Sequence, residues 1–346
     1  MATTQGSPSK TSSATIRDVA RQAGVSVATV SRVLNNPSVV SPDTYTRIQA
    51  TISELDFVPR AAARSLSKQK TNLIGLMMTD IRWDNFFPPM LRGIEAACFE
   101  SGFDLLIHST RLSGGIMRPP LGEHNIDGLL IFLNPLPDSE IARLHRKGFS
   151  IVLLHRSPPD GLPIPHVVFE NKAGARLMTN HLIETHACRR IAFLSGPADN
   201  EDSYWRELGY RESLAAHGLP VDPALIRLGG FAEEICRRTV EDWLKAGFNA
   251  DAIFAADDDS AYGAVRALQN AGKRVPEDVP VVGFDDSPVS RLLTPPLTTV
   301  CAPIEEAGYK AGQILAGLIR TGQATLKELL PTELVIRRSC GCNGYP

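Results

Sequence analysis

Short apolar runs alternate with helix-forming stretches over most of the sequence, from Leu73 to Phe284. Such runs are typical of buried strands, whereas apolar side chains spaced three and four residues apart indicate helices. Strands that alternate with helices form parallel sheets with helices on both faces, so we predict an α/β fold. The predicted strands are 73–78, 103–108, 128–133, 151–154, 167–169, 191–194, 252–255 and 279–284, and the predicted helices are 90–100, 139–147, 172–184, 203–217, 233–246 and 260–271.

These units are too many for one compact sheet, and we therefore predict two α/β lobes. Parallel sheets of this kind bind ligands beyond the carboxyl ends of their strands. Two lobes that face each other would place these ends on either side of a cleft. The sequence thus predicts a small-molecule site between the lobes.

The stretch Ile16–Asn35 precedes this region and has a different pattern. Gly24 interrupts a first helical repeat, Ser26 is a candidate N-cap, and Val30 and Val33 lie on the inner face of a second helix. A helix, a turn and a second capped helix form the helix-turn-helix pattern, whose second helix enters the DNA major groove. An ordinary helical hairpin is the alternative interpretation of the same spacing.

A third helix completes a predicted bundle over residues 15–58, with Ser41 as its cap and Pro42 at its first position. Residues 59–72 follow as a short helix-prone stretch and a polar linker. A helix this short is unstable alone, so we expect it to fold only on DNA beside a second copy of the chain. Residues 1–14 are rich in serine and threonine, and we expect a disordered tail.

Charge is distributed unevenly along the 346-residue chain. Residues 1–70 hold nine basic and four acidic side chains, whereas the whole chain has a net charge of −2. A basic head suits contact with phosphates. No apolar run approaches the roughly eighteen residues of a membrane span, and the N-terminus lacks an apolar signal core. We therefore expect a cytoplasmic protein with six reduced cysteines and no membrane partner.

Three groups of side chains could suggest a metal or an enzyme. Cys340 and Cys342 supply two thiols, which are too few for a structural zinc site. His181, His186 and Cys188 could suggest a second metal site, but the two histidines are five residues apart and are not expected to share a helix face. The acidic run 257–259 has no nucleophile with a base near it in sequence, and no phosphate-binding loop occurs. The sequence therefore predicts no metal, no catalytic residues and no cofactor.

Several motifs, in order, resemble the lactose-repressor (LacI/GalR) family of bacterial transcription regulators over residues 15–339. The matching stretches are IRDVA at 16–20, AGVS at 23–26, TVSRVLN at 29–35, ARSL at 63–66, ENKAGA at 170–175, RELGY at 206–210, VPEDV at 275–279, VGFDD at 282–286 and PLTTV at 296–300. The resemblance implies a three-helix helix-turn-helix head and a periplasmic-binding-protein-like core of two doubly wound parallel-sheet lobes.

The resemblance also implies how the chain is divided. Residues 73–168 and 302–331 would form the N-terminal lobe, and residues 169–301 and 332–346 the C-terminal lobe, with crossings near Phe169, Cys301 and Thr332. Two departures from the family pattern stand out. An Asp-Asp pair at 257–258 replaces the usual Asn-Asp, and the segment 110–125 lacks the usual second helix of the first lobe.

For DNA, the resemblance implies that Val27, Ala28 and Arg32 read bases, because an arginine can fork onto guanine and small apolar side chains contact thymine methyls. Leu66 would enter the minor groove as a wedge, with Ala63 allowing close approach. Arg60 stands where the family usually has asparagine, and we include it among the predicted DNA contacts. A solvated helix face is the alternative for two of the predicted phosphate contacts, Ser31 and Thr44. The full set of predicted phosphate contacts is Thr15, Ser26, Thr29, Ser31, Asn35, Ser41 and Thr44.

For the effector, the resemblance implies polar contacts from Arg206, Asp257 and Asp285, which suit a hydroxyl-rich ligand. Phe87 and Phe231 match positions where a ring packs on the ligand. Asp80 follows the first strand and could also reach the site, and so could the His-Arg pair at 155–156. For Asp285, the alternative is a carboxylate that caps the following turn.

These observations together predict a sequence-specific DNA-binding transcriptional regulator, a repressor, that acts as a homodimer on double-stranded operator DNA. A small-molecule effector, a sugar or sugar derivative bound between the lobes, would control its operator affinity. Two alternatives use the same scaffold. A solute-binding protein for a transporter would not need residues 15–66, and a sugar-acting enzyme would need a catalytic pair in the cleft.

Overall fold

A computed structural model describes residues 14–57 (except residue 36), 71–80, 85–110, 121–159 and 161–343. The chain divides into two compact units, residues 1–71 and 72–346. The expected tail at 1–13 and most of the expected hinge, with Arg60, Ala63 and Leu66, lie outside the described residues. Residues 111–120 of the atypical segment also lie outside them, and residues 121–125 form turns rather than a helix.

The first unit is a small helical bundle. Its helices are α1 (Ile16–Gln22), α2 (Val27–Asn35) and α3 (Pro42–Glu54), with a 3-10 turn at η1 (Pro37–Val39). Gly24 has a φ of +66°, a conformation that favours glycine, and it turns the chain between α1 and α2. Val19, Val30, Val33 and Ile48 are fully or almost fully buried and hold the three helices together. The predicted helix-turn-helix and third helix are confirmed.

The second unit begins with a six-stranded parallel sheet in the order β11-β5-β4-β3-β1-β2. Alternate residues of a strand point to opposite faces, so Ile74 and Leu76 pack under α5 and α12 whereas Met77 packs under α6. The strands are β1 (Leu73–Met78), β2 (Asp104–Ser109), β3 (Gly128–Phe132), β4 (Ser150–Leu154), β5 (His166–Phe169) and β11 (Lys327–Leu330), and the helices are α5 (Phe87–Glu100), α6 (Asp138–Arg146) and α12 (Ile304–Thr321).

A four-stranded parallel sheet in the order β7-β6-β8-β9 forms the second lobe. Phe193 and Phe254 pack under α7 and α8, whereas Leu194 and Ile253 pack under α9 and α10. The strands are β6 (Ile191–Ser195), β7 (Ile226–Leu228), β8 (Ala252–Ala255) and β9 (Val281–Val282), and the helices are α7 (Asn171–His186), α8 (Glu201–Ala216), η3 (Pro223–Leu225), α9 (Glu233–Lys245), α10 (Asp258–Asn270) and α11 (Pro288–Leu292).

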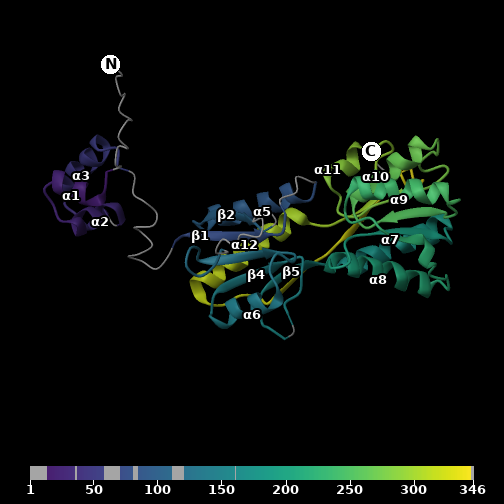
Figure 1. The fold of residues 1–346 in the computed structure, drawn as a ribbon, viewed down its shortest axis with the longest axis horizontal. Helices are drawn as coiled ribbons and strands as arrows, with labels where there is room; N and C mark the ends of the chain where they lie inside the picture. The colour runs from purple at the N-terminus through teal and green to yellow at the C-terminus, as the bar shows by residue number, and fades with distance from the viewer. Residues whose placement is uncertain are drawn as a thin grey trace, which may run out of the picture. The chain divides into compact units, whose positions relative to one another are not determined.

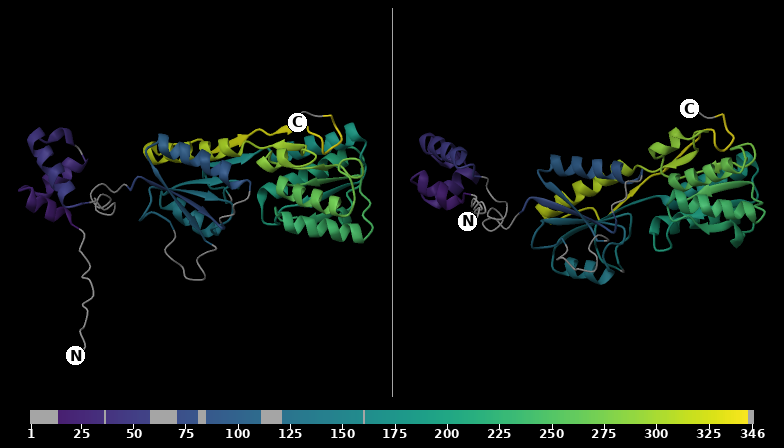
Figure 2. Two further views of the ribbon diagram at one scale, coloured as in Figure 1. Left: turned by 90° about the horizontal axis from the view of Figure 1, so that it is seen from above. Right: turned by 45° about the horizontal axis from the view of Figure 1, so that its top comes forward.

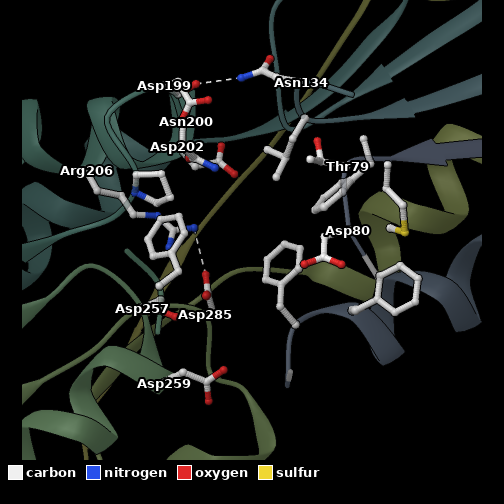
Figure 3. A pocket seen from close by; sticks show the side chains of 17 residues that line it. Thr79, Asp80, Asn134, Asp199, Asn200, Asp202, Arg206, Asp257, Asp259 and Asp285 are labelled. Atoms are coloured by element: carbon white, nitrogen blue, oxygen red, sulfur yellow. Dashed lines mark hydrogen bonds and ion pairs between the residues drawn. The ribbon is translucent and has the colours of Figure 1, made fainter. Parts of the chain in front are cut away.

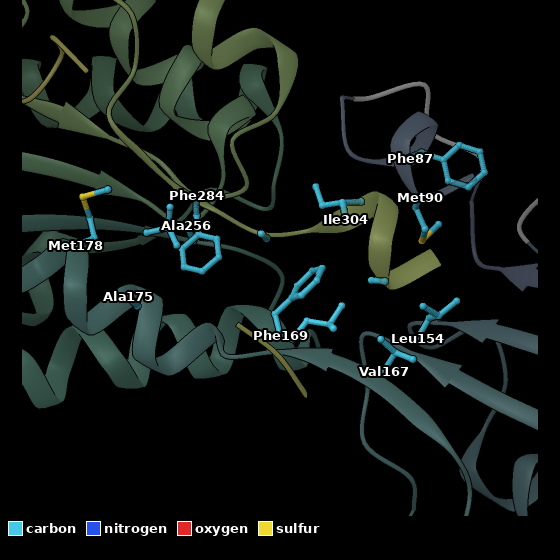
Figure 4. Packing of buried hydrophobic residues seen from close by; sticks show 14 of the residues in the cluster. Phe87, Met90, Leu154, Val167, Phe169, Ala175, Met178, Ala256, Phe284 and Ile304 are labelled. Atoms are coloured by element: carbon cyan, nitrogen blue, oxygen red, sulfur yellow. The ribbon is translucent and has the colours of Figure 1, made fainter. Parts of the chain in front are cut away.

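The chain passes between the two lobes at three places in the described residues (Figure 1). The passages run from β5 to α7, from β10 (Thr299–Cys301) to α12, and from β11 to β12 (Glu333–Val335), and β10 pairs antiparallel with β12. One cluster of buried hydrophobic side chains continues from one lobe into the other along these passages. Within it, Phe169 lies between the buried side chains of the first lobe and those of the second (Figure 4). The carboxyl ends of β1 and β3 and the amino ends of α8 and α10 consequently meet across one cavity.

Helices α5 and α12 lie side by side on one face of the first sheet (Figure 2). Their backbones touch, because a Cβ added at Gly93 would come within 2.0 Å of the Glu305 carbonyl oxygen, and one at Gly308 within 2.2 Å of the Met90 carbonyl oxygen. Only glycine fits at either position. This contact joins residues that are more than two hundred positions apart in the sequence.

The predicted alternation of strands and helices, and with it the α/β fold class of two parallel-sheet lobes, is confirmed. The strand predicted at 279–284 is too long, since β9 ends at Val282 and Gly283 lies against Asp258 and Leu297. Helix α12 was not among the predicted helices. Among the described residues, no helix is both long enough and apolar enough to span a membrane.

Candidate functional site

The head presents the amino-terminal part of α2 to solvent. Val27 is 42% exposed, and Ala28 and Arg32 are exposed as well, although their neighbours Val30 and Val33 are buried. An exposed valine at the start of an otherwise amphipathic helix adds little to the hydrophobic core of the head, but it is accessible for contact with a base. The three predicted base-reading residues thus share one accessible surface.

The predicted phosphate contacts lie around the helix starts of the head. Ser26 caps α2, where its Oγ accepts a hydrogen bond from the Thr29 backbone N–H at 3.1 Å. Thr15 donates from its backbone N–H and its hydroxyl to Asp18, at 3.0 and 2.6 Å. Ser41 precedes α3 and donates to the Thr44 hydroxyl at 2.9 Å. Thr15, Ser26 and Ser41 are exposed, Thr29, Ser31 and Thr44 are half-buried, and Asn35 is the last residue of α2.

A cavity of about 380 Å³ lies between the two lobes of the core (Figure 3). The first lobe contributes residues that follow β1 and β3 and those that begin α5. The second lobe contributes the loops before α8, α9 and α10 and the segment after β9. The lining residues are Met78, Thr79, Asp80, Phe86, Phe87, Phe132, Leu133, Asn134, Pro197, Asp199, Asn200, Asp202, Arg206, Phe231, Asp257, Asp259 and Asp285.

All six predicted effector residues line this cavity. Arg206 is the most constrained of them, with 2% of its surface exposed. Its Nη2 lies 2.9 Å from Asp285 Oδ1, and its Nε and Nη1 donate to the Asn171 side chain and the Ala256 carbonyl, at 2.8 and 2.6 Å. The guanidinium also stacks over the Phe284 ring, 3.8 Å from its centroid. The protein itself therefore fixes the orientation of the guanidinium before any ligand enters.

Two carboxylates of the second lobe are buried beside Arg206. Burial and, secondarily, the neighbouring Asp285 together raise the pKa of Asp257 to about 7. Burial likewise raises the pKa of Asp285 to about 7, although Arg206 opposes that shift. Asp257 also caps α10, since its Oδ1 accepts from the Ser260 N–H at 3.1 Å. The cavity thus holds acidic groups that ionise near neutral pH.

Hydrogen bonds join the lobes around the cavity. His155 Nδ1, after β4, lies 2.9 Å from Asp202 Oδ2 on α8, and Asn134 donates to the Asp199 carbonyl at 2.8 Å. Ser157 donates from its N–H and its hydroxyl to Glu201, at 2.5 and 2.7 Å, and Asn85 donates to Asp259 at 2.6 Å. These contacts join the two lobes across the cavity.

Asp202 was not among the predicted effector residues, and His155, which the sequence suggested could reach the site, is not among the residues that line the cavity. His155 is buried and its ring packs edge-on against Phe86, Phe132 and Phe169, with centroids 4.7 to 5.5 Å away. Burial opposes ionisation of Asp202, yet His155 and Arg206 hold its pKa below the ordinary value. Asp202 stands one helical turn before Arg206, and this spacing could have identified it.

The structure corrects the expectation that His181 and His186 lie apart. His186 is the last residue of α7, and its Nε2 lies 3.3 Å from that of His181 despite the five-residue spacing. Cys342 Sγ lies 3.4 Å from His186 Nε2. The two histidines and the two terminal cysteines therefore form one cluster rather than separate, unrelated side chains.

Comparison with known proteins places these features in a family. Residues 15–60 match the model for bacterial regulatory proteins of the lacI family, and residues 179–340 match the periplasmic binding protein-like domain. The transcriptional regulator CelR of Thermobifida fusca is 35% identical, over 94% of this chain and 98% of that protein. A CelR–cellobiose complex aligns with a TM-score of 0.69 at 32% identity, over 94% of this chain and 99% of that chain.

The lac repressor dimer bound to operator and the anti-inducer ONPF aligns with a TM-score of 0.81 at 27% identity, over 95% of this chain and 99% of that chain. The likeness to these regulators extends through both the head and the core. It includes the head that presents α2 and the lobes that enclose the cavity. The chain belongs to the LacI family, and it is a DNA-binding transcriptional regulator.

Proposed function

We propose that this regulator is a repressor whose operator affinity is set by a sugar bound in the interlobe cavity. The observation that carries the proposal is the composition of the cavity wall. Carboxylates and a fixed guanidinium from one lobe face a group of phenylalanine rings contributed mainly by the other. Carboxylate oxygens accept from hydroxyls, the guanidinium donates to them, and the rings pack against the C–H faces of a sugar.

The size of the cavity narrows the ligand class. Its volume of about 380 Å³ lies near the lower end of the range of about 300–1,000 Å³ for small-molecule sites. We infer a monosaccharide or disaccharide rather than a longer oligosaccharide. The cellobiose in the CelR complex, a relative at 32% identity, is consistent with this class.

The contacts between the lobes supply the link from effector to DNA. A ligand shifts a conformational equilibrium only by its different affinity for the two states. A sugar that bridges Asp80 and Phe87 of one lobe and Arg206 and Asp285 of the other favours the closed state. The resulting lobe angle is transmitted to the heads of a homodimer, in which each head takes one half of a near-palindromic operator.

At the operator, Arg32 forks onto a guanine while Val27 and Ala28 contact thymine methyls. The predicted hydroxyl contacts of the head fix its register on the phosphates. Leu66 and Ala63 stay as proposed minor-groove contacts, and Arg60 stays as a further proposed DNA contact. This activity requires a cytoplasmic protein and involves no catalysis. The cavity carboxylates accept hydrogen bonds from the ligand and do not act as a catalytic acid–base pair.

A ligand screen on the full-length protein tests the proposal. A specific sugar at about 100 times its Kd should stabilise the folded protein by about 2.7 kcal/mol and raise its melting temperature. The same sugar should then change operator affinity in a binding titration. A protein that responds only to nucleobases, or a sugar that binds without changing operator affinity, would contradict the proposal.

A further inference from the structure

Four potential metal ligands converge at the far end of α7, outside the interlobe cavity. His181 and His186 come from the last turns of α7, and Cys340 and Cys342 come from the segment that follows β12. The four ligand atoms all lie within 4.8 Å of one another. Cys340 is fully buried, and the other three side chains are half-buried. None of the four residues lines the cavity.

The distances among the ligand atoms of His181, His186 and Cys342 match those around a tetrahedral zinc ion. With Zn–N bonds of about 2.0–2.1 Å and Zn–S bonds of about 2.3 Å, two nitrogens stand about 3.3 Å apart and a nitrogen stands about 3.5 Å from a sulfur. The two Nε2 atoms are 3.3 Å apart. Cys342 Sγ lies 3.4 Å from His186 Nε2 and 3.8 Å from His181 Nε2.

The backbone places each ligand by a specific feature. Helix α7 ends at His186 because Ala187 adopts a φ of +54°, and this end lets the His186 ring turn back toward His181. Gly341 has a φ of +102°, a conformation that favours glycine, and it separates the two cysteines. A Cβ added at Gly341 would lie 3.5 Å from the His186 ring, so the turn packs directly on the imidazole.

Neighbouring groups orient the ligands further. The Thr185 hydroxyl lies 3.3 Å from His181 Nδ1, which leaves Nε2 of that ring directed into the cluster. The Thr298 hydroxyl donates to Cys340 Sγ at 3.1 Å. Partners of this kind on the outer side of a ligand are typical of zinc sites, where they fix the tautomer of a histidine and the position of a thiolate.

We propose that His181, His186, Cys340 and Cys342 bind one structural Zn²⁺ per chain. Two thiolates and two imidazoles in tetrahedral geometry favour zinc over magnesium or calcium, which prefer oxygen ligands. All four positions are filled by protein side chains, and a closed site of this kind is structural rather than catalytic. The ion fastens the carboxyl-terminal segment to the end of α7, so it stabilises the C-terminal lobe without taking part in effector binding.

Metal analysis of the full-length protein tests this site. The protein is purified in reductant with any polyhistidine tag removed, dialysed, and analysed for zinc by mass spectrometry. We expect one zinc per chain in the wild type. Cys342→Ser and His186→Gln should hold almost none, because each removes one of four ligands. Cys301→Ser and His124→Gln, which change a cysteine and a histidine outside the cluster, should each keep one zinc.

Cobalt provides a second readout that does not depend on how the variants fold. Wild-type protein stripped of zinc and loaded with Co²⁺ should show the intense visible absorption of tetrahedral cobalt with thiolate ligands, and added Zn²⁺ should abolish it. Thr185→Val, a change on the surface of α7, should weaken Zn²⁺ affinity about 10-fold while the helix stays folded.

Some outcomes would overturn the proposal. Reduced wild-type protein that binds neither Zn²⁺ nor Co²⁺ at micromolar concentration would show that the cluster is only a packed group of side chains. Stoichiometric zinc in folded Cys342→Ser and His186→Gln proteins would show that the metal lies elsewhere. Neither result would affect the proposed sugar site, because the ligand screen measures a different cavity.

Discussion

Arg206 and Asp285 form an ion pair of 2.9 Å that is buried inside the second lobe while it lines the interlobe cavity. Every nitrogen of the guanidinium has a partner within the protein, namely Asp285, the Asn171 side chain and the Ala256 carbonyl. The pair therefore serves the fold as well as the ligand. We therefore expect substitutions at either position to lower the free energy of unfolding, and not only to change the response to effector.

Arg206→Ala should lower the free energy of unfolding of the core by about 3–5 kcal/mol, because it leaves Asp285 buried without its partner. Urea unfolding followed by circular dichroism measures this change. In a double-mutant cycle, Asp285→Ala should cost less in the Arg206→Ala background than in the wild type. Arg211→Ala, which breaks a half-buried pair with Glu207 on the same helix, should cost only about 0.5 kcal/mol. Equal losses for Arg206→Ala and Arg211→Ala would contradict the structural role of the buried pair.

Stability without effector should fall as the pH rises from about 4 to about 7. Burial raises the pKa of Asp257 and Asp285 to about 7, so in this range the folded protein binds more protons than the unfolded chain. The free energy of unfolding is therefore greatest below the unfolded pKa of these groups and declines through the folded pKa. Asp257→Asn should flatten the profile measured by chemical denaturation at several pH values. Asp242→Asn, which alters an exposed carboxylate, should leave its slope unchanged.

Glu201→Ala should weaken effector binding several-fold, because it removes the two hydrogen bonds from Ser157 that join the lobes beside the cavity. Each such bond contributes about 0.5–1.5 kcal/mol, so the open state gains population when they are lost. Calorimetric titration with the sugar found by the screen measures the effect. Glu207→Ala changes an acid on the same helix that pairs only within α8, and it should bind effector like the wild type. If Glu201→Ala binds with unchanged affinity, the interlobe bonds do not favour the closed state.

Arg32→Ala should weaken binding to the operator by about 1–3 kcal/mol more than binding to random DNA, if Arg32 forks onto a guanine. Arg47→Ala removes a similar exposed charge from α3 and should affect both DNAs by the same factor or neither. Fluorescence anisotropy with both duplexes at several salt concentrations gives these affinities. A loss that is equal on the two DNAs would limit Arg32 to phosphate contact.

Most of the fold was predictable from local patterns. The strand Leu73–Met78 is buried at every position after the first and was predicted at its observed boundaries. Ser41-Pro42 carries the chemistry of a helix start, so the start of α3 was predicted correctly, whereas its end was predicted near Phe57 and lies at Glu54. Helix α12 was missed because it lies beyond the last predicted strand and the alternation was not followed past Phe284. Its contact with α5 depends on Gly93 and Gly308, which carry no apolar side chain that could signal burial.

The six predicted effector positions do line one cavity, but the contacts that join the two lobes beside it were not predictable from the sequence. His155 joins Asp202 across the two lobes, and this contact depends on how the lobes close rather than on any local pattern. The cluster of His181, His186, Cys340 and Cys342 also could not be predicted from local spacing. Periodicity describes side chains within a helix, whereas His186 stands at a helix end and Cys342 arrives from a segment more than 150 residues away.

Because α5 packs against α12, the first lobe cannot finish folding until α12 has been synthesised. The first sheet begins at Leu73, yet the helix that covers it and the strand that closes its edge, α12 and β11, span residues 304–330. The second lobe lies almost wholly between these parts and leaves the ribosome before them. The first lobe therefore stays without its covering helix for most of translation, with the surface of α5 around Gly93 exposed. A chain truncated before residue 304 would retain most of the second lobe but could not finish the first.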